Sequence, residues 1–482
     1  MFMKKKLRTH LALLTASSIL AGCATIPQTG EVHDFELPFV NDYSICNHVS
    51  FRWSDTFLTS DCDRYQQELA GPLSALAASV YGYRLYMDSR TLSSLGFKTD
   101  EMYRRYGLDL DYSDPRLGRD QVGFTFATKR SVLNGSPCEI LMVVVRGTFG
   151  RDEWISNMNP CNSWGRDPHP NLEDFPPLHE GFSRATDCVE EELVRYVAQH
   201  QLSLPTTKVV ITGHSRGAAV ANILGARLND YATSRLPSPL NSLKRENVYV
   251  YTFATPNTVI NEDVEADAPR YRNIFNIINP EDVVPLVPIA RWNYRRFGND
   301  LKLFCYDDLS LWSVWWDGAY NRMKDSFMEM TGYEWWHMPF GAQSTLAVPA
   351  LLGAVAPSLL TLYEVPSEMR REGGNTSVHS ILEYVIFKTM DDPAVAEREI
   401  SLGGDVAQIA AAYSTIEDSP GADTNAPALF FTPDGRNFSE QPGAFDIPWR
   451  LTCMHATQTY IGWMKAAEEY GPRRVFSNPP EE

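Results

Sequence analysis

Positive charge is scarce in this chain of 482 residues, which carries 43 lysines and arginines against 60 aspartates and glutamates, a formal net charge of −17. This balance argues against a nucleic-acid partner, because binding to a phosphate backbone needs a basic face. The sequence also lacks a Cys-x-x-Cys pair and any His/Cys cluster at ligand spacing, which argues against a structural zinc. Internal repeats and low-complexity tracts are absent too. With 44% hydrophobic and 21% charged residues, the composition is that of an ordinary globular protein.

The first 22 residues have the pattern of a bacterial export signal. A basic run at residues 4–8 (KKKLR) precedes an apolar stretch at 11–20, which is too short to span a membrane. The segment 20–23 (LAGC) resembles the lipobox of bacterial lipoproteins, in which the cysteine becomes the diacylated first residue of the mature chain. We therefore expect a lipoprotein signal peptide over residues 1–22 and acyl chains such as palmitate on Cys23.

Lipidation of Cys23 implies an exported protein that is anchored to a membrane of the bacterial cell envelope. The next residue, Ala24, is not the aspartate that retains some lipoproteins at the inner membrane, so the outer membrane is the expected destination in a Gram-negative cell. Residues 23–40 contain two prolines and a glycine. We predict that they form a lipid-anchored tether outside the folded core.

Seven further cysteines remain in the expected mature chain, and disulfide bonds are permitted in an exported protein. Because seven is odd, at least one thiol stays unpaired within the chain, and the spacing alone leaves the pairing open. These residues are Cys46, Cys62, Cys138, Cys161, Cys188, Cys305 and Cys453.

From about residue 65 onward, apolar runs of strand length alternate with stretches of helical spacing. Strands that alternate with helices indicate an α/β fold, and continuous apolar runs indicate strands buried on both faces of a mostly parallel, doubly wound sheet. We expect one large domain over residues 41–482. The predicted helices cover 65–83 and 218–228, and the predicted strands cover 139–145, 208–212, 247–253 and 273–278.

The pentapeptide at 213–217 (GHSRG) is the strongest local indication of chemistry. A Gly-x-Ser-x-Gly sequence places its serine on a tight turn between a strand and a helix, and the two glycines let the backbone pass close to its neighbours. Here a predicted strand comes directly before the pentapeptide and a predicted helix directly after it. Ser215 is therefore the candidate nucleophile, which needs a base to accept its proton and an acid to orient that base.

Asp282 is the candidate acid, because it follows the last predicted strand and so lies at the carboxyl edge of the sheet, where catalytic groups collect in open α/β folds. Its neighbour Glu281 is the local alternative. In the expected order of serine, acid and histidine, the base comes after the acid. Three histidines do: His337 lies in an aromatic segment typical of packing, whereas His379 and His455 each open a His-x4-Tyr segment of helical character. We take His455 as the base and His379 as the alternative.

Five further segments surround GHSRG in a fixed order. They are VVVRGT at 143–148, EWISN at 153–157, HEGF at 179–182, FATPN at 253–257 and DVVP at 282–285. In this order the segments resemble the class 3 lipases (fungal-type triacylglycerol lipases), and particularly their bacterial members. The resemblance covers about residues 60–300 and resumes at the C-terminal His-x4-Tyr segment.

The resemblance implies a catalytic domain of the α/β-hydrolase fold with a Ser-His-Asp triad and no metal or organic cofactor. It makes Ser215 the nucleophile, Asp282 the orienting acid and His455 the base, since the family places its histidine just before the closing helix of the core. It puts Thr148 in the oxyanion hole, together with the backbone N–H of Arg216. The residues expected to be structural are Trp154, His179 and Phe182.

A long insertion, at about residues 299–450, separates the acid from the preferred base. Its segment 335–363 contains no Asp, Glu, Lys or Arg and is long enough to span a membrane. Three prolines interrupt the segment, and a span here would place Ser215 and His455 on opposite sides of a membrane. We predict instead a helical, apolar cap or lid over the site, with burial as an extra pair of core helices as the alternative.

Together these features predict a lipid-anchored serine hydrolase that cleaves carboxylic esters of acylglycerols or phospholipids through an acyl-enzyme. Its expected partners are the lipid or ester substrate and the membrane. Two alternatives stay open: an esterase for short-chain or polysaccharide-bound acyl groups, and a catalytically silent surface-binding lipoprotein with a hydrolase fold. A fold does not choose its substrate, so the acyl chain length and the oligomeric state stay open as well.

Overall fold

The computed structural model describes residues 29–38, 46–105, 122–148, 157, 178–233, 235, 238–260, 265–288, 294–304, 313–337 and 447–480. The α-helices are α2 (Gln67–Ser79), α3 (Met87–Ser94), α5 (Glu180–His200), α6 (Arg216–Ala232), α7 (Ser313–Thr331), α11 (Ile447–His455) and α12 (Thr457–Tyr470). The strands are β1 (Glu31–Pro38), β2 (Cys46–Trp53), β3 (Lys98–Arg105), β4 (Phe124–Leu133), β5 (Ser136–Val145), β6 (Thr207–His214), β7 (Val248–Phe253), β8 (Val259–Ile260), β9 (Ile274–Ile278), β10 (Tyr294–Arg295) and β11 (Asn299–Lys302). Short 3₁₀ helices are η1 (Asp55–Thr59), η2 (Val80–Leu85), η3 (Leu204–Thr206), η4 (Arg245–Asn247), η5 (Pro269–Tyr271), η6 (Val284–Leu286) and η10 (Pro472–Arg474).

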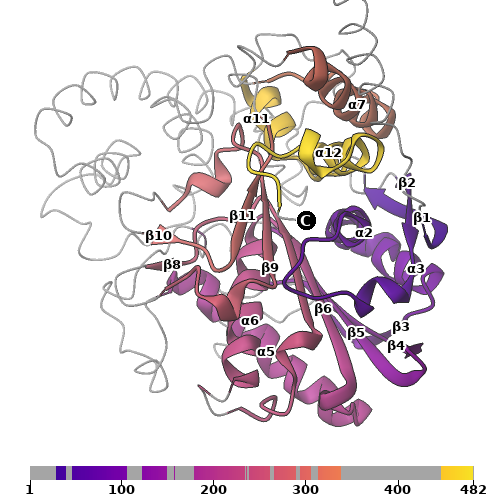
Figure 1. Ribbon diagram of the computed structural model, residues 1–482, viewed down its shortest axis with the longest axis vertical. Helices are drawn as coiled ribbons and strands as arrows, with labels where there is room; N and C mark the ends of the chain where they lie inside the picture. The colour runs from indigo at the N-terminus through magenta and orange to yellow at the C-terminus, as the bar shows by residue number, and fades with distance from the viewer. Residues whose placement is uncertain are drawn as a thin grey trace, which may run out of the picture.

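Seven strands form the central sheet, in the order β11-β9-β7-β6-β5-β4-β3 (Figure 1). The five strands from β11 to β5 run parallel, β4 pairs with β5 in the antiparallel direction, and β3 pairs with β4 in the antiparallel direction. The predicted α/β fold with a mostly parallel sheet is confirmed. The four predicted strands correspond to β5, β6, β7 and β9, and the two predicted helices to α2 with η2 and to α6.

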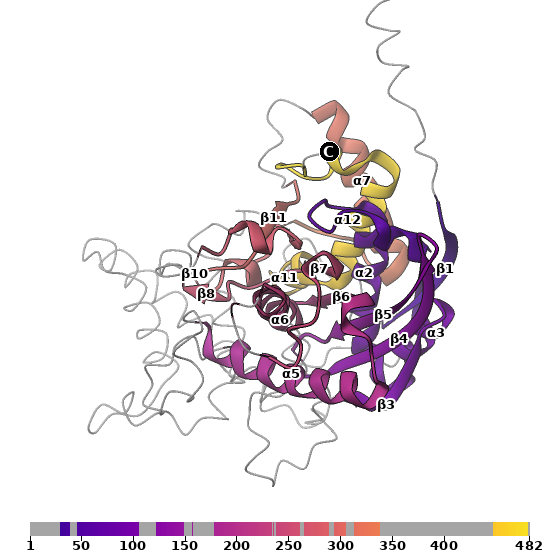
Figure 2. The ribbon, with the colours of Figure 1, turned by 60° about the horizontal axis from the view of Figure 1, so that its bottom comes forward.

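Both faces of the sheet are covered, which explains the continuous buried runs in its inner strands β5, β6, β7 and β9. Along β5 the side chains of Leu141 and Val143 join the core under α5 and α6, whereas Ile140 and Met142 join the core under α2 and α12. Successive strand residues point to opposite faces, so both sets are buried. α5 and α6 lie on one side of the sheet and α2 and α12 on the other (Figure 1, Figure 2).

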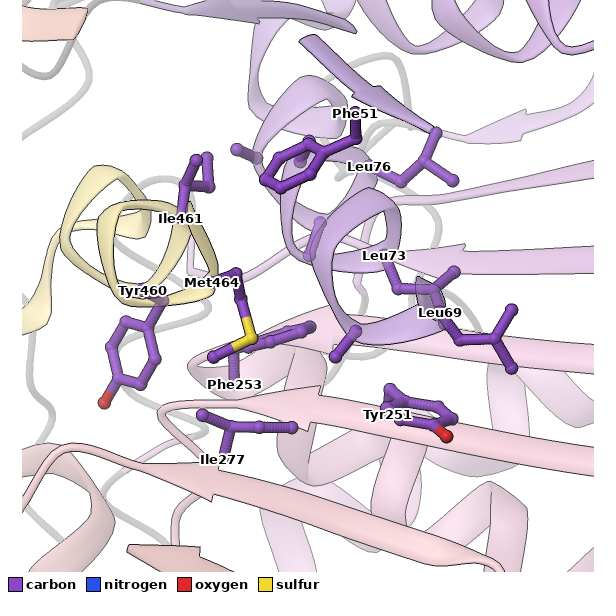
Figure 3. Close-up of a cluster of buried hydrophobic side chains, with 14 of the residues drawn as sticks. Phe51, Leu69, Leu73, Leu76, Tyr251, Phe253, Ile277, Tyr460, Ile461 and Met464 are labelled. Atoms are coloured by element: carbon purple, nitrogen blue, oxygen red, sulfur yellow. The ribbon is translucent and has the colours of Figure 1, made fainter. Parts of the chain in front are cut away.

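The C-terminal helix α12 closes the core on the α2 side of the sheet. Figure 3 shows its Tyr460, Ile461 and Met464 against α2 and against the strands β7 and β9. The helix α7 packs along α12 so closely that a Cβ built on Gly462 would lie 2.7 Å from the carbonyl oxygen of Met323. Helices from the two ends of the chain therefore share one apolar cluster.

The predicted tether over residues 23–40 is wrong for residues 31–38, which form β1. This strand pairs with β2 in an antiparallel register, and Phe35 and Leu37 are fully buried against α2 and α3. Phe35 and Leu37 follow the period of two that marks a strand with one buried face. The predicted signal peptide and Cys23 lie outside the described residues.

The predicted insertion at 299–450 is wrong at its start, because this part of the chain belongs to the main core. β11 forms the edge of the central sheet, α7 packs on α12, and Trp335 is 2% exposed. The cap prediction depends mainly on residues 338–363, which lie outside the described residues, and it stays a prediction. Among the helices that the structure describes, none has both the length and the apolar character that a membrane crossing requires.

Candidate active site

Ser215 stands at a sharp turn between β6 and α6, as the Gly-x-Ser-x-Gly pattern predicts. Its backbone has φ +60° and ψ −128°, a conformation that residues with a side chain rarely adopt. The amide of Ser215 donates to the carbonyl oxygen of Phe253 at 3.0 Å, which ties the turn to β7. A Cβ built on Gly217 would lie 2.3 Å from the carbonyl oxygen of Val145, so only glycine fits where this turn passes β5. The turn thus sets Ser215 at the carboxyl edge of the sheet.

The structure brings Ser215, His455 and Asp282 together from three distant parts of the sequence. The Oγ of Ser215 lies 2.9 Å from Nε2 of His455, and Nδ1 of His455 lies 2.8 Å from Oδ2 of Asp282. An ionised carboxylate only accepts hydrogen bonds, so Nδ1 carries the hydrogen and Nε2 is left to accept from the serine hydroxyl. All three residues are buried. In this arrangement a histidine can remove the proton of a serine as it attacks a carbonyl carbon.

His455 is the last residue of α11, and Ala456 separates it from α12. The histidine therefore lies just before the closing helix, as the family resemblance implies, whereas the sequence did not indicate α11. His379, the alternative base, lies outside the described residues. Of the two acids considered, it is Asp282 whose carboxylate contacts the histidine.

The carboxylate of Asp282 is fixed by two further donors. Its Oδ2 also accepts from the hydroxyl of Tyr460 at 2.8 Å, and its Oδ1 accepts from the amide of Val284 at 2.9 Å. Burial, followed by the nearby charge of Asp282, raises the pKa of Tyr460 well above its ordinary value, so the phenol stays a donor. Tyr460 had no role in the sequence prediction, although its His-x4-Tyr spacing from His455 was visible there.

Thr148 follows β5, three residues beyond Val145 and beside the start of α6. Its Oγ1 accepts a hydrogen bond from Nδ2 of Asn157 at 2.8 Å, and Oδ1 of Asn157 accepts from Nη1 of Arg216 at 2.9 Å. Because the oxygen of Thr148 accepts this bond, the hydroxyl hydrogen of Thr148 points away from Asn157 and can be donated to another group. Arg216 is the first residue of α6, where the N–H groups of a helix attract negative charge. Thr148 and the amide of Arg216 are thus suited to bind an oxyanion.

His179 contacts the main chain of Asn157. It caps α5, where its Nδ1 accepts from the amide of Phe182 at 3.3 Å, and its Nε2 lies 3.2 Å from the carbonyl oxygen of Asn157. The rings of His179 and Phe182 stack with centroids 3.8 Å apart. Burial and then the charge of Arg216 lower the pKa of His179 to about 3, so the ring stays neutral. These contacts suit the structural role predicted for His179 and Phe182, while Trp154 lies outside the described residues.

Asn157 is the second residue to which the sequence prediction gave no role. It is the last residue of the EWISN segment, which supports the family resemblance but does not by itself indicate what the asparagine contacts. In the structure, Asn157 links the oxyanion candidate Thr148 to Arg216.

One group of potential metal ligands lies close together in the described part of the chain: Asp61, Cys62 and Asp63. Asp63 pairs with Nη1 of Arg245 at 3.1 Å. Burial, followed by the charge of Asp63, raises the pKa of the Cys62 thiol to about 12, so this sulfur stays protonated. The group is therefore poorly suited to a metal.

A mostly parallel sheet with a serine turn after β6, an acid after β9 and a histidine beside the last helix is the arrangement of the α/β-hydrolase fold. Residues 142–292 match the family model for Lipase (class 3). The resemblance to the class 3 lipases predicted from the sequence is confirmed.

Curated relatives include a lipase of Rhizomucor miehei, 26% identical over 186 residues, which are 36% of this chain and 45% of the relative. A secreted mono- and diacylglycerol lipase 2 of Gibberella zeae is 25% identical over 189 residues, which are 34% of this chain and 43% of the relative. The chain thus spans less than half the length of these curated relatives.

Similar solved structures include a triacylglyceride lipase of Rhizomucor miehei, with a TM-score of 0.35 and 20% identity over 50% of this chain and 81% of the other. Lipase II of Rhizopus niveus has a TM-score of 0.32 and 15% identity over 49% of this chain and 80% of the other.

Proposed function

We propose that this protein is a serine hydrolase that cleaves carboxylic esters of acylglycerols or phospholipids. The observation that carries the proposal is the continuous row of contacts from Ser215 through His455 to Asp282, at 2.9 Å and 2.8 Å. The family match over residues 142–292 supports it. Among the relatives, the Gibberella zeae protein is named a mono- and diacylglycerol lipase, which favours acylglycerols as the substrate class.

In the first half of the reaction, Ser215 Oγ forms a bond to the ester carbonyl carbon while Nε2 of His455 takes its proton. The carbonyl oxygen becomes negative, and Thr148 with the Arg216 amide donates hydrogen bonds to it. Each such donor is typically worth about 3 kcal/mol of transition-state stabilisation. His455 then protonates the alcohol, which leaves as the ester bond breaks, and Ser215 carries the acyl group.

In the second half, His455 removes a proton from water, whose oxygen attacks the acyl carbon. The bond to Ser215 breaks, the serine oxygen regains its proton from His455, and the fatty acid leaves. Throughout, Asp282 stays ionised and balances the positive charge that His455 acquires. Every step uses groups of the chain, the ester and water.

A fluorophosphonate probe tests the nucleophile and the base in one experiment. The mature wild-type protein should be labelled, whereas Ser215→Ala and His455→Ala should not, and His379→Ala should be labelled like wild type. Ser203→Ala, at an exposed serine, is the matched control and should be labelled fully. Labelling that is lost in His379→Ala but kept in His455→Ala would overturn the assignment of the base.

Micelles and chain length test the substrate class and the predicted cap. If the segment 338–363 covers the site, detergent micelles should increase labelling of the wild type. Long-chain p-nitrophenyl esters should be cleaved faster than acetate or butyrate esters. A preference for acetate would favour the short-chain or polysaccharide-acyl esterase, and absence of labelling with and without micelles would favour a binding protein.

We also propose that the protein is anchored to the cell envelope through acyl chains on Cys23. The lipobox-like segment 20–23 supports lipidation of Cys23. Multiple acyl chains on this residue would hold the protein stably in a bilayer. In bacterial cells fed labelled palmitate, the wild type should carry the label and sediment with membranes. Cys23→Ser should carry none, and membrane-bound label in that variant would refute the anchor.

A further inference from the structure

Side chains from three other segments hold the C-terminal end of α11, the helix that carries His455. The last carbonyl groups of a helix have no N–H partner within it. Here three consecutive carbonyl oxygens each accept from a side-chain donor. The pairs are Cys453 with Nε1 of Trp335 at 3.2 Å, Met454 with Nδ2 of Asn279 at 2.9 Å, and His455 with Nε2 of His214 at 2.8 Å. The main chain of the base is therefore fixed by donors from elsewhere in the fold.

The donor to His455 comes from the nucleophile's own turn, since His214 is the last residue of β6 and directly precedes Ser215. A carbonyl oxygen only accepts, so Nε2 of His214 carries a hydrogen and Nδ1 of the neutral ring is an acceptor. The hydroxyl of Tyr81 lies 3.0 Å from this Nδ1 and donates to it. Burial and then the neighbouring His455 hold the pKa of His214 well below its ordinary value, so the ring stays neutral.

Tyr81 in turn lies against the segment that leads to the oxyanion candidate. A Cβ built on Gly147 would be 1.7 Å from the hydroxyl of Tyr81, and the residue after Gly147 is Thr148. The row of contacts from Tyr81 through His214 to the carbonyl of His455 thus adjoins the turn of the nucleophile, the base and the segment that leads to Thr148. Its members are buried, with Tyr81 7% and His214 4% exposed.

We propose that His214 is a positioning residue, which holds the main chain of His455 so that the imidazole stays aligned with Ser215 and Asp282. The proposal rests on the ester hydrolysis proposed above. The rings of His214 and His455 lie 4.7 Å apart between centroids, so one side chain both holds the carbonyl and packs on the catalytic ring. Loss of the donor frees the junction between α11 and α12, and a misplacement of about 1 Å in an active site costs on the order of 10²-fold in rate.

A matched pair of substitutions separates the hydrogen bond from simple packing. Gln at position 214 carries an amide nitrogen at about the reach of Nε2, whereas the amide of Asn is too short to meet the carbonyl of His455. Both are polar, neutral and smaller than or similar to histidine. We expect His214→Asn to lower kcat on a p-nitrophenyl ester about tenfold or more, with KM changed less than about twofold. His214→Gln should recover kcat to within about threefold of wild type.

The surface residue His200, which pairs with Asp100, provides the control, and His200→Gln should keep the wild-type kcat. Thermal unfolding of each variant shows whether it is folded. If His214→Asn and His214→Gln are both folded and have equal kcat, His214 does not position the base. A rise in KM with unchanged kcat would overturn the proposal as well, since alignment of the base affects the chemical step.

A second measurement does not depend on activity. In protein labelled with ¹⁵N-histidine, the ring signals that disappear in His214→Gln belong to His214, and at pH 7 they should be those of a neutral ring with its hydrogen on Nε2. A His214 ring with its hydrogen on Nδ1, or a charged ring, would overturn the proposal. A wild type that shows the expected tautomer but cleaves no ester would instead contradict the proposed function.

Discussion

Replacing Tyr460 with phenylalanine tests how hydrogen bonds stabilise the buried carboxylate of Asp282. Asp282 is 0% exposed, and its Oδ2 accepts from both Nδ1 of His455 and the hydroxyl of Tyr460, each at 2.8 Å. A hydrogen bond to a charged group is worth about 1.5–3 kcal/mol. The hydroxyl of Tyr460 also lies 3.3 Å from the amide of Asn279, which loses its acceptor in the variant. We therefore expect the free energy of unfolding to fall by about 2–3 kcal/mol.

Urea unfolding of the wild type and of Tyr460→Phe measures this change in the free energy of unfolding.

Tyr470→Phe is the matched control, because Tyr470 ends the same helix at a partly exposed position. It should leave the free energy of unfolding unchanged. A Tyr460→Phe protein with wild-type stability would refute the reasoning, since the phenol would then contribute nothing to the carboxylate.

Three further predictions concern the oxyanion side of the site. Thr148→Val removes a proposed oxyanion donor and should lower kcat/KM by about 10²- to 10³-fold without changing Tm; a loss of less than about tenfold would contradict that role. Asn157→Ala should lower kcat/KM about tenfold, because Asn157 orients Thr148. In Thr148→Val protein the same change should lower kcat/KM no further, and additive losses in this double-mutant cycle would mean that the two residues act independently. The pKa of His179, about 3, lies below the ordinary 6.5 of the unfolded chain, so the unfolded state binds the proton first and stability falls by about 1.4 kcal/mol per pH unit as the pH drops from about 6.5 to 3. Between pH 7.5 and pH 5, the free energy of unfolding measured in urea should therefore fall by about 2 kcal/mol less in His179→Asn than in the wild type. An equal fall in both proteins would mean that folding does not lower the pKa of His179.

The central sheet was predictable because its strands are buried on both faces. Continuous apolar runs such as EILMVVV at 139–145 indicate buried strands, because a surface strand alternates apolar and polar residues. The turn at Ser215 follows from two glycines that no larger residue can replace. β1 was missed because its strand pattern involves only Phe35 and Leu37 and lies beside a proline. α7 was missed because its place in the core is set by contacts with α12, far along the chain, and β11 because Leu301 is the one buried residue of this short strand.

The residues that reach the site through long-range contacts were the ones that sequence patterns did not reveal. Asn157 lies in the EWISN segment and Tyr460 in the His-x4-Tyr segment, but a spacing does not show which group an amide or a phenol contacts. His214 stood inside GHSRG itself. Its partner is the main chain of a residue 241 positions away, and no local pattern encodes such a pair.

The contacts that hold α11 and α12 do not depend on an unbroken chain between residues 338 and 446. His455 keeps its place through Trp335, Asn279, His214 and the packing of α12 on α2 and α7, none of which involves residues 338–446. Cleavage within that stretch would break the covalent path between acid and base and leave each of these contacts intact. A nicked chain should then behave as a non-covalent pair, in which the C-terminal fragment, with α11 and α12, is a docked peptide that delivers the base. Mixing that peptide with the remainder of the protein would be a case of fragment complementation, with the catalytic histidine supplied from a separate molecule.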